Sequence, residues 1–538
     1  MNRLPSTPAP GKPLVRIPSS DAVVTAFYMI VIFVSCFTLY TWNNDFSIRY
    51  HPDEPSKVAQ VLSPTQERNF NHPQLMLEAT LWTMRVLNVP SEPGAALRTG
   101  RCVSAGLMSL AVCAVAYAAY RAGGRGAMGV VAVSVGLCPQ ALAAAHYFKE
   151  DAALLAGVTC VVAASWLYVT LPRRSGWRAF VPVALLGASV AVAASAKYVG
   201  ALALVPALLV VLFSTPRRSV VSSIVAFFVS LIATVGVINH RAVTNFAEFR
   251  RGFLRELEHG ITDKLAITMN KPNGFFISAA VEETMPHVLV LGGLGLVALV
   301  VRARRRRLRA WDVIVPVFFP ALVLTALSWS IIPLNRYVLP VVVLLHVLAA
   351  LGVIWWTDRI GDEPARSHRR GRILWLMTGV IGVIQLPYCL IYNAQFGRDT
   401  RDDLRAWVID HVPVSDVIAA DTRAGLVGVN GPPAVPADQR IGNVVHTSRF
   451  ASELGDLDTL RDRGVRYVAV SSVVYARLFS PHVRGAVDDP DSAARLRAWY
   501  ETLFRDGELV YQKRPLVPMN SVQASPEVRL YRIAPASE

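Results

Sequence analysis

The chain has 538 residues, of which 53% are hydrophobic and only 17% are charged. Its net charge of +16 lies mostly in short basic stretches between long apolar runs, which argues against a nucleic-acid-binding protein. Because apolar runs of about 18 residues or more recur along the chain, we expect a protein that crosses a membrane many times.

We predict eleven membrane-spanning helices from these runs. The first run is too long for the apolar region of a signal peptide and lacks a small-residue cleavage site, so we interpret it as a retained anchor after a basic cytoplasmic tail at 1–20. The predicted spans cover about residues 22–41, 98–120, 127–145, 152–171, 179–196, 199–213, 219–239, 284–301, 313–331, 337–356 and 373–392.

Basic residues in every second connection set the predicted orientation. The positive-inside rule places the N-terminal tail and these connections in the cytoplasm, and hence predicts a multi-pass protein of the cytoplasmic membrane. The stretch 179–213 must then cross twice, whereas 72–87 lies along the outer surface as an amphipathic helix. The basic connections read "RAGGRG", "PRRSGWR", "STPRRS", "RARRRRLR" and "TDRIGDEPARSHRRGR".

Three long segments fall on the predicted outer side: the loops 42–97 and 240–282, and the domain 398–538. In the second loop, phenylalanines recur at helical spacing from Phe246, which indicates a surface-lying amphipathic helix. Such a helix is either a lid over a lipid-facing groove or plain interfacial packing. His259 lies on it and does not decide between the two.

The C-terminal segment has a different pattern from the rest of the chain. Short strands are predicted at 416–422, 466–472 and 527–533, and amphipathic helices at 450–464 and 491–506. Alternation of strands and helices favours a small α/β domain. The expected fold is therefore an all-α membrane domain, residues 21–397, followed by an external α/β domain.

The first cluster of chemically useful side chains is "HPDEP", directly after the first span. Asp53 and Glu54 are adjacent carboxylates in a proline-bounded turn, with His51 just upstream. Burial beside a bilayer and mutual repulsion both raise a carboxyl pKa toward the range that suits a general base. The alternative is a solvated turn that holds the helix end at the interface.

The second cluster is "HYFKED", at the outer end of the third span. His146 and Glu150 are four residues apart, with Lys149 and Asp151 beside them. This set could orient a sugar hydroxyl, or it could anchor the interface and supply acidic residues to the first turn of a helix. A metal site is the less favoured use, because such His–carboxylate pairs are common.

Two cations at the predicted outer face suit a phosphate. Lys197 lies in an apolar hairpin with no acid nearby in sequence, which indicates a ligand or a transport pathway. Arg336 begins a late span, where a guanidinium can bind phosphate through two hydrogen bonds. Each residue could instead reach the lipid headgroups without a specific ligand.

Taken together, these residues describe an external site with carboxylates, fixed cations and access from the lipid. Transfer of a sugar from a lipid-linked sugar phosphate needs all three. The acceptor hydroxyl needs a base, and cations stabilise the charge that grows on the departing lipid phosphate.

Several motifs resemble those of polyprenyl-phosphate-sugar-dependent glycosyltransferases of the GT-C fold, in glycosyltransferase family 39. Protein O-mannosyltransferases and lipid A aminoarabinose transferases are similar in plan. The motifs are "HPDEP", "NHPQL", "KED", "SAKYVGAL", "NRYVLPVVVLLHVLAALG" and "DLRAWVIDHVPVSDVIAAD".

The resemblance implies roles for individual residues. Asp53 would be the catalytic carboxylate with Glu54 in support, and Glu150 and Asp151 would form a second acidic site. Two residues depart from the family's pattern. Glu150 stands where the family has proline, and Gln74 stands where a second proline is usual. Donor-phosphate ligands would be Lys149, Lys197 and Arg336, and further outer-face candidates are His51, His72, His146, Tyr198 and His259.

The resemblance also implies inverting attack on a polyprenyl-phosphate sugar, mannose-like, without an obligatory metal or other cofactor. The acceptor could be a protein, a lipid or a glycan, and neither it nor the sugar is specified by the sequence. One alternative function is a transporter or lipid-linked sugar flippase, which would need polar groups near mid-membrane. Another is a non-catalytic anchor or sensor acting through its C-terminal domain.

Overall fold

The computed structural model describes most of the chain, but the predicted basic tail lies almost wholly outside the described part. The described residues are 19–47, 50–51, 53–63, 68–171, 176–261, 267–269, 274–305, 309–330, 334–357, 364–432, 435, 437–480, 483–485, 489–517 and 525–533.

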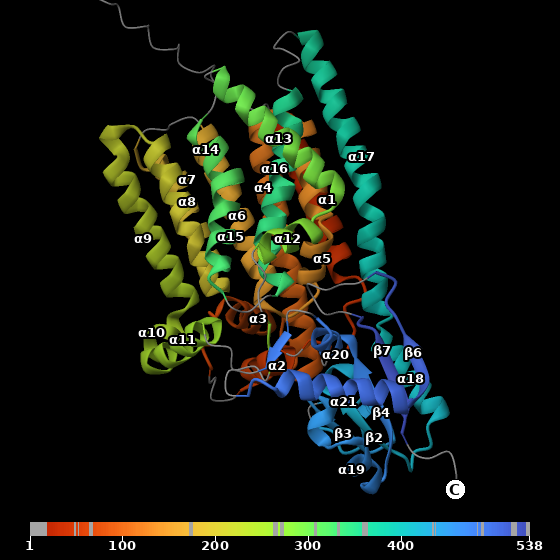
Figure 1. The fold of residues 1–538 in the computed structure, drawn as a ribbon. Helices are drawn as coiled ribbons and strands as arrows, with labels where there is room; N and C mark the ends of the chain where they lie inside the picture. Colours follow the sequence, from red (N-terminus) through yellow and green to blue (C-terminus); the bar gives the residue numbers. More distant parts are fainter. Residues whose placement is uncertain are drawn as a thin grey trace, which may run out of the picture.

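Long apolar helices form a bundle that makes up one end of the molecule (Figure 1). Within the described ranges, eight helical stretches are long and apolar enough to cross a membrane. They are built on α1 (Ser19–Thr41), the first part of α4 (Pro93–Gly136), α6 (Glu150–Thr170), α9 (Val220–Ile238), α13 (Pro286–Arg304), α14 (Ala310–Val313) with α15 (Phe319–Ser328), α16 (Leu339–Thr357) and α17 (Pro364–Gly397).

Three further apolar segments account for the other predicted spans. The second part of α4 and α5 (Pro139–Ala145) form a pair bent by 62°, and α7 (Val181–Ala196) and the segment Tyr198–Ser214 are shorter apolar helices. Helix α4 changes direction at Gly124, whose φ of 76° favours glycine. Every predicted span thus coincides with an apolar helix, while the count of eleven crossings stays a prediction.

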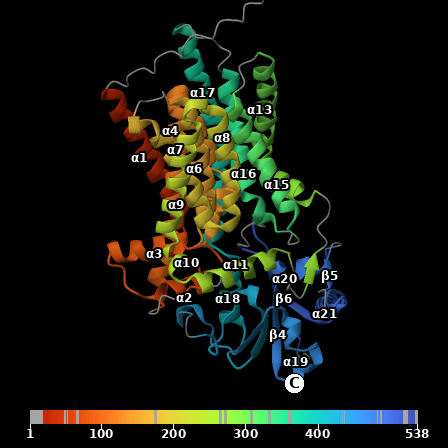
Figure 2. The ribbon, with the colours of Figure 1, turned by 90° about the vertical axis from the view of Figure 1, so that its left-hand side faces the viewer.

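Four short helices lie at the opposite end of the bundle from the N-terminus, next to the C-terminal domain (Figures 1 and 2). Helix α11 packs on the chain before α3, with Phe249 and Phe70 rings 6.1 Å apart. A Cβ on Gly252 would lie 2.5 Å from the Asn69 carbonyl oxygen, so only glycine permits this approach. The helices are α2 (Glu54–Leu62), α3 (Leu75–Val86), α10 (His240–Thr244) and α11 (Phe246–Ile261).

The C-terminal part is a small mixed sheet with helices packed on it. The order of its five strands is β3-β2-β4-β7-β6, with β2 parallel to β3 and β4, and β7 antiparallel to β4 and β6. A separate short pair joins β1 to β5. Two elements lie earlier in the chain, before α13: β1 (Ile267–Met269) and α12 (Phe275–Glu282). The elements of the C-terminal part are α18 (Thr400–His411), β2 (Val417–Asp421), β3 (Val445–Ser448), α19 (Leu457–Asp462), β4 (Val465–Ser471), α20 (Ser472–Leu478), β5 (Val483–Gly485), α21 (Ser492–Asp506), β6 (Glu508–Lys513) and β7 (Val528–Arg532).

The strands predicted around β2, β4 and β7 are present, as is the helix predicted at 491–506. The single helix predicted at 450–464 is wrong, because Gly455 has a φ of 136° and separates a 3-10 turn from α19. Strand β3 was not expected, since only one of its four residues is buried and it has no apolar alternation.

A buried ion pair fixes the start of α2 to the helix bundle. Arg101 Nε and Nη2 donate to the two Glu54 carboxylate oxygens at 2.9 and 2.6 Å, and both side chains are buried. Arg101 Nη1 also donates to the carbonyls of Asn44 and Phe46, while the Phe148 N–H donates to Glu54 at 2.8 Å. This network satisfies both charges, as a buried pair requires.

A second buried arginine joins the C-terminal domain to the same region. Arg401, in the first turn of α18, forms a two-point ion pair with Asp399, at 2.8 and 2.7 Å. Its guanidinium lies over the Tyr50 ring at 3.9 Å and donates to the Tyr50 carbonyl. The sheet domain is therefore held against the segment that carries Asp53.

We expect Arg101→Met to destabilise the protein by about 3–5 kcal/mol, because it leaves the Glu54 carboxylate buried without a partner. The double variant Arg101→Met with Glu54→Gln should recover part of this loss, since no uncompensated charge remains. Thermal unfolding in detergent measures both. Equal stability of the single variant and the wild type would contradict this role for the pair.

Candidate functional site

Four of the predicted site residues form a continuous chain of charges. Lys149 Nζ lies 2.7 Å from Asp53 Oδ2 and 3.7 Å from Asp151 Oδ2, and Lys197 Nζ lies 2.9 Å from Asp151 Oδ1. Residues from three separate segments of the sequence therefore meet at the end of the bundle that faces the C-terminal domain (Figure 2).

Helix ends position these side chains. Asp53 immediately precedes α2, and Asp151 lies in the first turn of α6, where a carboxylate is stabilised by the helix dipole. Lys149 and Lys197 are extended residues at helix junctions, with φ near −145° and −151°. Asp151 thus lies in the first turn of a helix, and Asp53, Lys149 and Lys197 lie directly before one, so rigid helices limit the movement of all four.

The environment sets the protonation state of Asp53 and its neighbours. Burial raises the pKa of Asp53, but attraction to Lys149, which also donates a hydrogen bond to it, outweighs burial and holds that pKa well below its usual range. Burial and repulsion from Arg336 lower the pKa of Lys149 to about 8. Burial also lowers the pKa of His51, whose Nε2 is 3.2 Å from Lys149 Nζ, so at neutral pH the imidazole is uncharged.

Glu150 does not join Asp151 in facing the open part of the site. Its carboxylate is hydrogen-bonded to the buried Lys57 of α2. Burial lowers the pKa of Lys57 to about 7. The expected second acidic site is thus divided: Asp151 contacts Lys149 and Lys197, whereas Glu150 ties α6 to α2.

A cavity of about 190 Å³ opens beside Asp151 and Lys197. Arg336 lies on its wall, and its buried Nε has no hydrogen-bond partner. No salt bridge joins Arg336 to any residue of the described ranges. Apolar residues form much of the rest of its wall: Leu154, Leu155, Leu327, Leu339 and Pro340. The cavity therefore combines two cations, Lys197 and Arg336, and two carboxylates, Asp151 and Glu256, with an apolar wall. Cations beside an apolar wall suit a lipid phosphate.

His72 and Tyr198 also line this cavity, and so does Glu256 of α11. Tyr198 donates to the Phe70 carbonyl at 2.9 Å, and burial lowers the pKa of His72 to about 3. Helix α11 thus borders the cavity, in the place expected of a lid.

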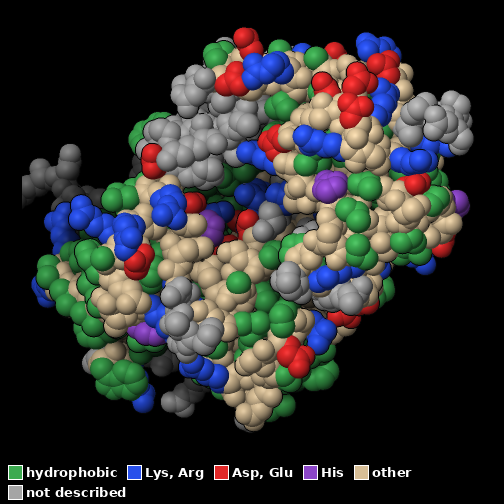
Figure 3. All heavy atoms as spheres, turned by 90° about the horizontal axis from the view of Figure 1, so that it is seen from below, with side chains coloured by type: hydrophobic (Ala, Val, Ile, Leu, Met, Phe, Trp, Pro, Cys, Tyr) green, Lys and Arg blue, Asp and Glu red, His purple; other side chains and the backbone are tan. Residues whose placement is uncertain are grey.

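The C-terminal domain adds positive charge to this region. Arg423, which follows β2, is half-buried and interacts electrostatically with Arg401, Asp53 and Arg336. Burial, followed by repulsion from Arg401, lowers its pKa to about 10, and attraction to Asp53 acts in the opposite direction. Seen from below, blue Lys and Arg side chains lie in and beside a recess near the centre of the face, together with red Asp or Glu and purple His side chains (Figure 3).

Other predicted site residues have different surroundings. Glu54 pairs with Arg101, whereas Asp53 pairs with Lys149. The two adjacent carboxylates therefore do not act together as expected. His146 Nε2 lies 2.9 Å from the Trp42 carbonyl and its ring stacks on Phe396, which makes it a packing residue. The side chain of His259 lies outside the described residues.

Sequence reasoning missed three charged residues of this region: Lys57, Arg101 and Arg423. Arg101 carried a usable signal, because a charge at the start of an apolar span demands a partner. Lys57 and Arg423 carried none, since nothing local distinguishes them from exposed surface cations. Across the described residues, no group of three or more His, Cys, Asp and Glu side chains is arranged to hold a metal ion.

No protein-family model matches the chain, and no curated protein matches it. Among solved structures it is similar to ArnT from Cupriavidus metallidurans bound to undecaprenyl phosphate, with 13% identity, 96% of this chain and 99% of that chain covered, and a TM-score of 0.50. It is also similar to the archaeal oligosaccharyltransferase AglB from Archaeoglobus fulgidus in complex with an inhibitory peptide and a dolichol-phosphate, with 10% identity, 94% and 76% covered, and a TM-score of 0.53. The chain thus has the GT-C fold of membrane glycosyltransferases.

Proposed function

We propose that this protein is a membrane glycosyltransferase that moves a sugar from a polyprenyl-phosphate donor to an acceptor hydroxyl. The observation that carries the proposal is the cavity in which Lys197, Arg336 and Asp151 meet an apolar wall, beside the Lys149–Asp53 pair. The likeness in fold to ArnT bound to undecaprenyl phosphate supports the class of donor.

The donor would enter with its isoprenoid chain along the apolar wall and its phosphate toward Arg336 and Lys197. Arg336 offers a buried N–H without a partner, which a phosphate oxygen would satisfy. Lys197 is already paired with Asp151, so it is held in place rather than free to rotate. A fixed cation is better suited than a mobile one to stabilise charge that develops during reaction.

Asp53 would act as the general base. It would take the proton of the acceptor hydroxyl as that oxygen bonds to the anomeric carbon, while the bond from this carbon to the phosphate oxygen breaks. Polyprenyl phosphate leaves with the bonding electrons, and Lys197 and Arg336 stabilise the new negative charge. The side chain of Asp53 is 37% exposed, which leaves it open to an acceptor.

The low pKa of Asp53 makes it a weak base as long as Lys149 neutralises it. A donor phosphate would add negative charge next to Lys149 and Arg336 and compete with Asp53 for Lys149. That competition raises the pKa of Asp53 toward the reaction's working range. Donor binding would thereby prepare the base for the acceptor.

The remaining parts of the proposal come from the sequence. The basic connections favour a site on the outer side of the cytoplasmic membrane, with the N-terminus inside and the C-terminal domain outside. The resemblance favours a mannose-like donor, inversion at the anomeric carbon and no obligatory cofactor. The acceptor is a protein, lipid or glycan hydroxyl.

Asp53→Asn should lower turnover by roughly 10²–10⁴-fold, because the amide cannot accept the acceptor proton. Transfer from a polyprenyl-phosphate sugar by the purified protein measures this. Asp45→Asn is the matched control, since Asp45 is exposed on the same connection and forms none of these contacts. Turnover of Asp53→Asn equal to that of Asp45→Asn would rule out the base assignment.

Arg336→Gln should raise the KM for the sugar donor by roughly tenfold or more, because the variant loses a charged side chain that donates hydrogen bonds to the phosphate. The KM for the acceptor should stay within about twofold. Arg398→Gln, a charge change at an exposed position after α17, serves as the control. A selective rise in the acceptor KM would instead place Arg336 at the acceptor.

The pH dependence should follow Lys149. Its protonated form holds Asp53 and receives the phosphate, so kcat/KM for the donor should fall as the pH rises above about 8. Lys149→Arg keeps its charge at higher pH and should move this fall upward by at least about one pH unit. An unchanged alkaline limb in Lys149→Arg would show that another group controls it.

A further inference from the structure

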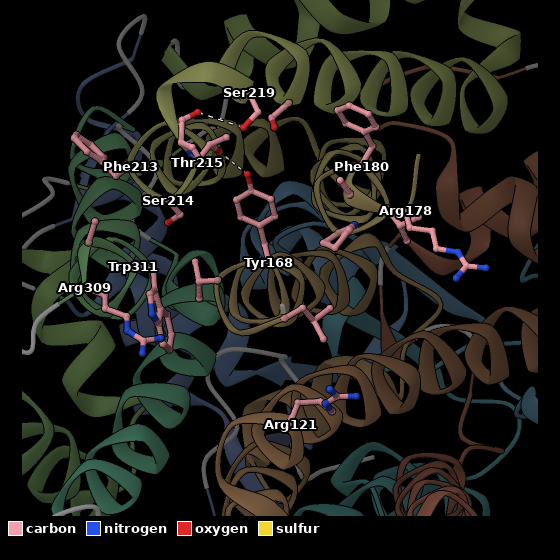
Figure 4. A pocket seen from close by; sticks show the side chains of 18 of the residues that line it. Arg121, Tyr168, Arg178, Phe180, Phe213, Ser214, Thr215, Ser219, Arg309 and Trp311 are labelled. Atoms are coloured by element: carbon pink, nitrogen blue, oxygen red, sulfur yellow. Dashed lines mark hydrogen bonds between the residues drawn. The ribbon is translucent and has the colours of Figure 1, made fainter. Parts of the chain in front are cut away.

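A second and larger cavity lies at the far end of the helix bundle. Its volume is about 810 Å³, and it is lined by α4, by the ends of α6 and of the segment Tyr198–Ser214, by the starts of α7 and α9, and by α14 (Figure 4). Helix α6 has 21 residues and is therefore about 30 Å long. Asp151 lies in its first turn and Tyr168 of the cavity in its last, so the two cavities lie near opposite membrane faces.

The charge of this cavity is one-sided. Arg121, Arg178 and Arg309 line it, and the described lining residues include no Asp or Glu. None of these three guanidinium groups forms a salt bridge with a residue in the described part of the chain. Asp312, an acid on α14 close to the lining residue Arg309, accepts a hydrogen bond from the Arg309 main chain and pairs with Arg302 at 3.6 Å.

Unused hydrogen-bond donors accompany these cations. Trp311 is 5% exposed, lines the cavity, and its indole N–H has no hydrogen-bond partner. Helices α7 and α9 also begin at the cavity, and neither has a side chain that caps its first N–H groups. A buried donor without a partner is costly, so an anion with several acceptor oxygens is the ligand that fits.

The rim of the cavity indicates where that anion comes from. Phe213, which lines the cavity, is 68% exposed. Trp177, which precedes the lining residue Arg178 in sequence, is 71% exposed. Such exposed aromatic side chains are typical of a membrane interface. The volume is also far larger than an inorganic phosphate needs, since a water molecule takes about 30 Å³. Hydroxyl groups of Thr215 and Ser219 on the wall suit a polyol headgroup.

We propose that this cavity binds the anionic headgroup of a membrane phospholipid, attracted by the arginines on its separate walls, with the acyl chains along the outer surface of the bundle. The site is separate from the proposed transfer site and does not depend on it. It would tie helices α6, α7, α9 and α14 together at the membrane face opposite the chemistry.

The test compares lipid retention by variants of the full-length protein. Native mass spectrometry counts phosphatidylglycerol and phosphatidylcholine that stay bound after purification and titration with each lipid. The cavity variant is Arg121→Gln, Arg178→Gln and Arg309→Gln together. Its matched control is Arg217→Gln, Arg218→Gln and Arg304→Gln, which removes the same charge from exposed positions near the same membrane face.

We expect the wild type and the control to retain phosphatidylglycerol over phosphatidylcholine, and the cavity variant to bind phosphatidylglycerol at least tenfold more weakly. Equal losses in the cavity variant and its control would contradict a specific site, as would no loss in either. Displacement of the lipid by millimolar inorganic phosphate would also overturn the proposal, because the ligand would then be a free anion.

A smaller change guards against misfolding of the triple variant. Trp311→Phe removes the indole N–H together with the five-membered ring, and keeps an aromatic ring beside Trp166, whose ring centroid lies 5.6 Å from that of Trp311. It should weaken phosphatidylglycerol binding about threefold or more without changing the melting temperature by more than about 2 °C. Unchanged phosphatidylglycerol binding by Trp311→Phe would mean that its N–H does not face the headgroup, and would contradict the proposal.

Discussion

The buried Glu54–Arg101 ion pair is the constraint on which the candidate site depends. Arg101 belongs to the bundle helix α4, and Glu54 begins α2, so the pair fixes where α2 starts. Asp53 immediately precedes Glu54 and is therefore placed by the same contact. The Phe148 N–H also bonds to Glu54, which places Lys149 next to Asp53. One ion pair thus sets both members of the proposed base–cation pair.

The adjacent carboxylates Asp53 and Glu54 divide two tasks between them. Glu54 is fully buried and accepts hydrogen bonds from the Arg101 guanidinium and from the Phe148 main-chain N–H. These bonds offset the cost of burying its charge. Asp53 is partly exposed and meets a lysine whose own pKa is lowered by burial and by Arg336. That lysine is shared with Asp151, so in the proposed mechanism a donor phosphate competes for a cation that already contacts two carboxylates. The same division recurs at Glu150, which is tied to Lys57, and Asp151, which faces the cavity.

Much of the architecture could be predicted from the sequence, because apolar runs and basic connections report directly on a bilayer. The prediction that these segments share the outer face of the membrane also led us to expect that five side chains meet at one end of the bundle: Asp53, Lys149, Asp151, Lys197 and Arg336. The partner of each charge did not follow, since Glu54 and Arg101 are 47 residues apart and Lys57 and Glu150 are 93 apart. Charge sign and helical spacing carry no information about such long-range contacts. For this reason the expected pairings of Glu54 with Asp53, and of Glu150 with Asp151, differ from the observed ones, and Arg423 of the sheet domain was not foreseen.

The central claim is that this site transfers a sugar and releases a lipid phosphate. The most direct measurement incubates the purified wild-type protein with a panel of polyprenyl-phosphate sugars and cell-envelope acceptors, and quantifies polyprenyl phosphate and glycosylated product together. We expect one donor to give both products in a one-to-one ratio. Binding of donors with no release of polyprenyl phosphate, together with movement of the intact lipid-linked sugar across a reconstituted membrane, would contradict the claim and identify a transporter instead.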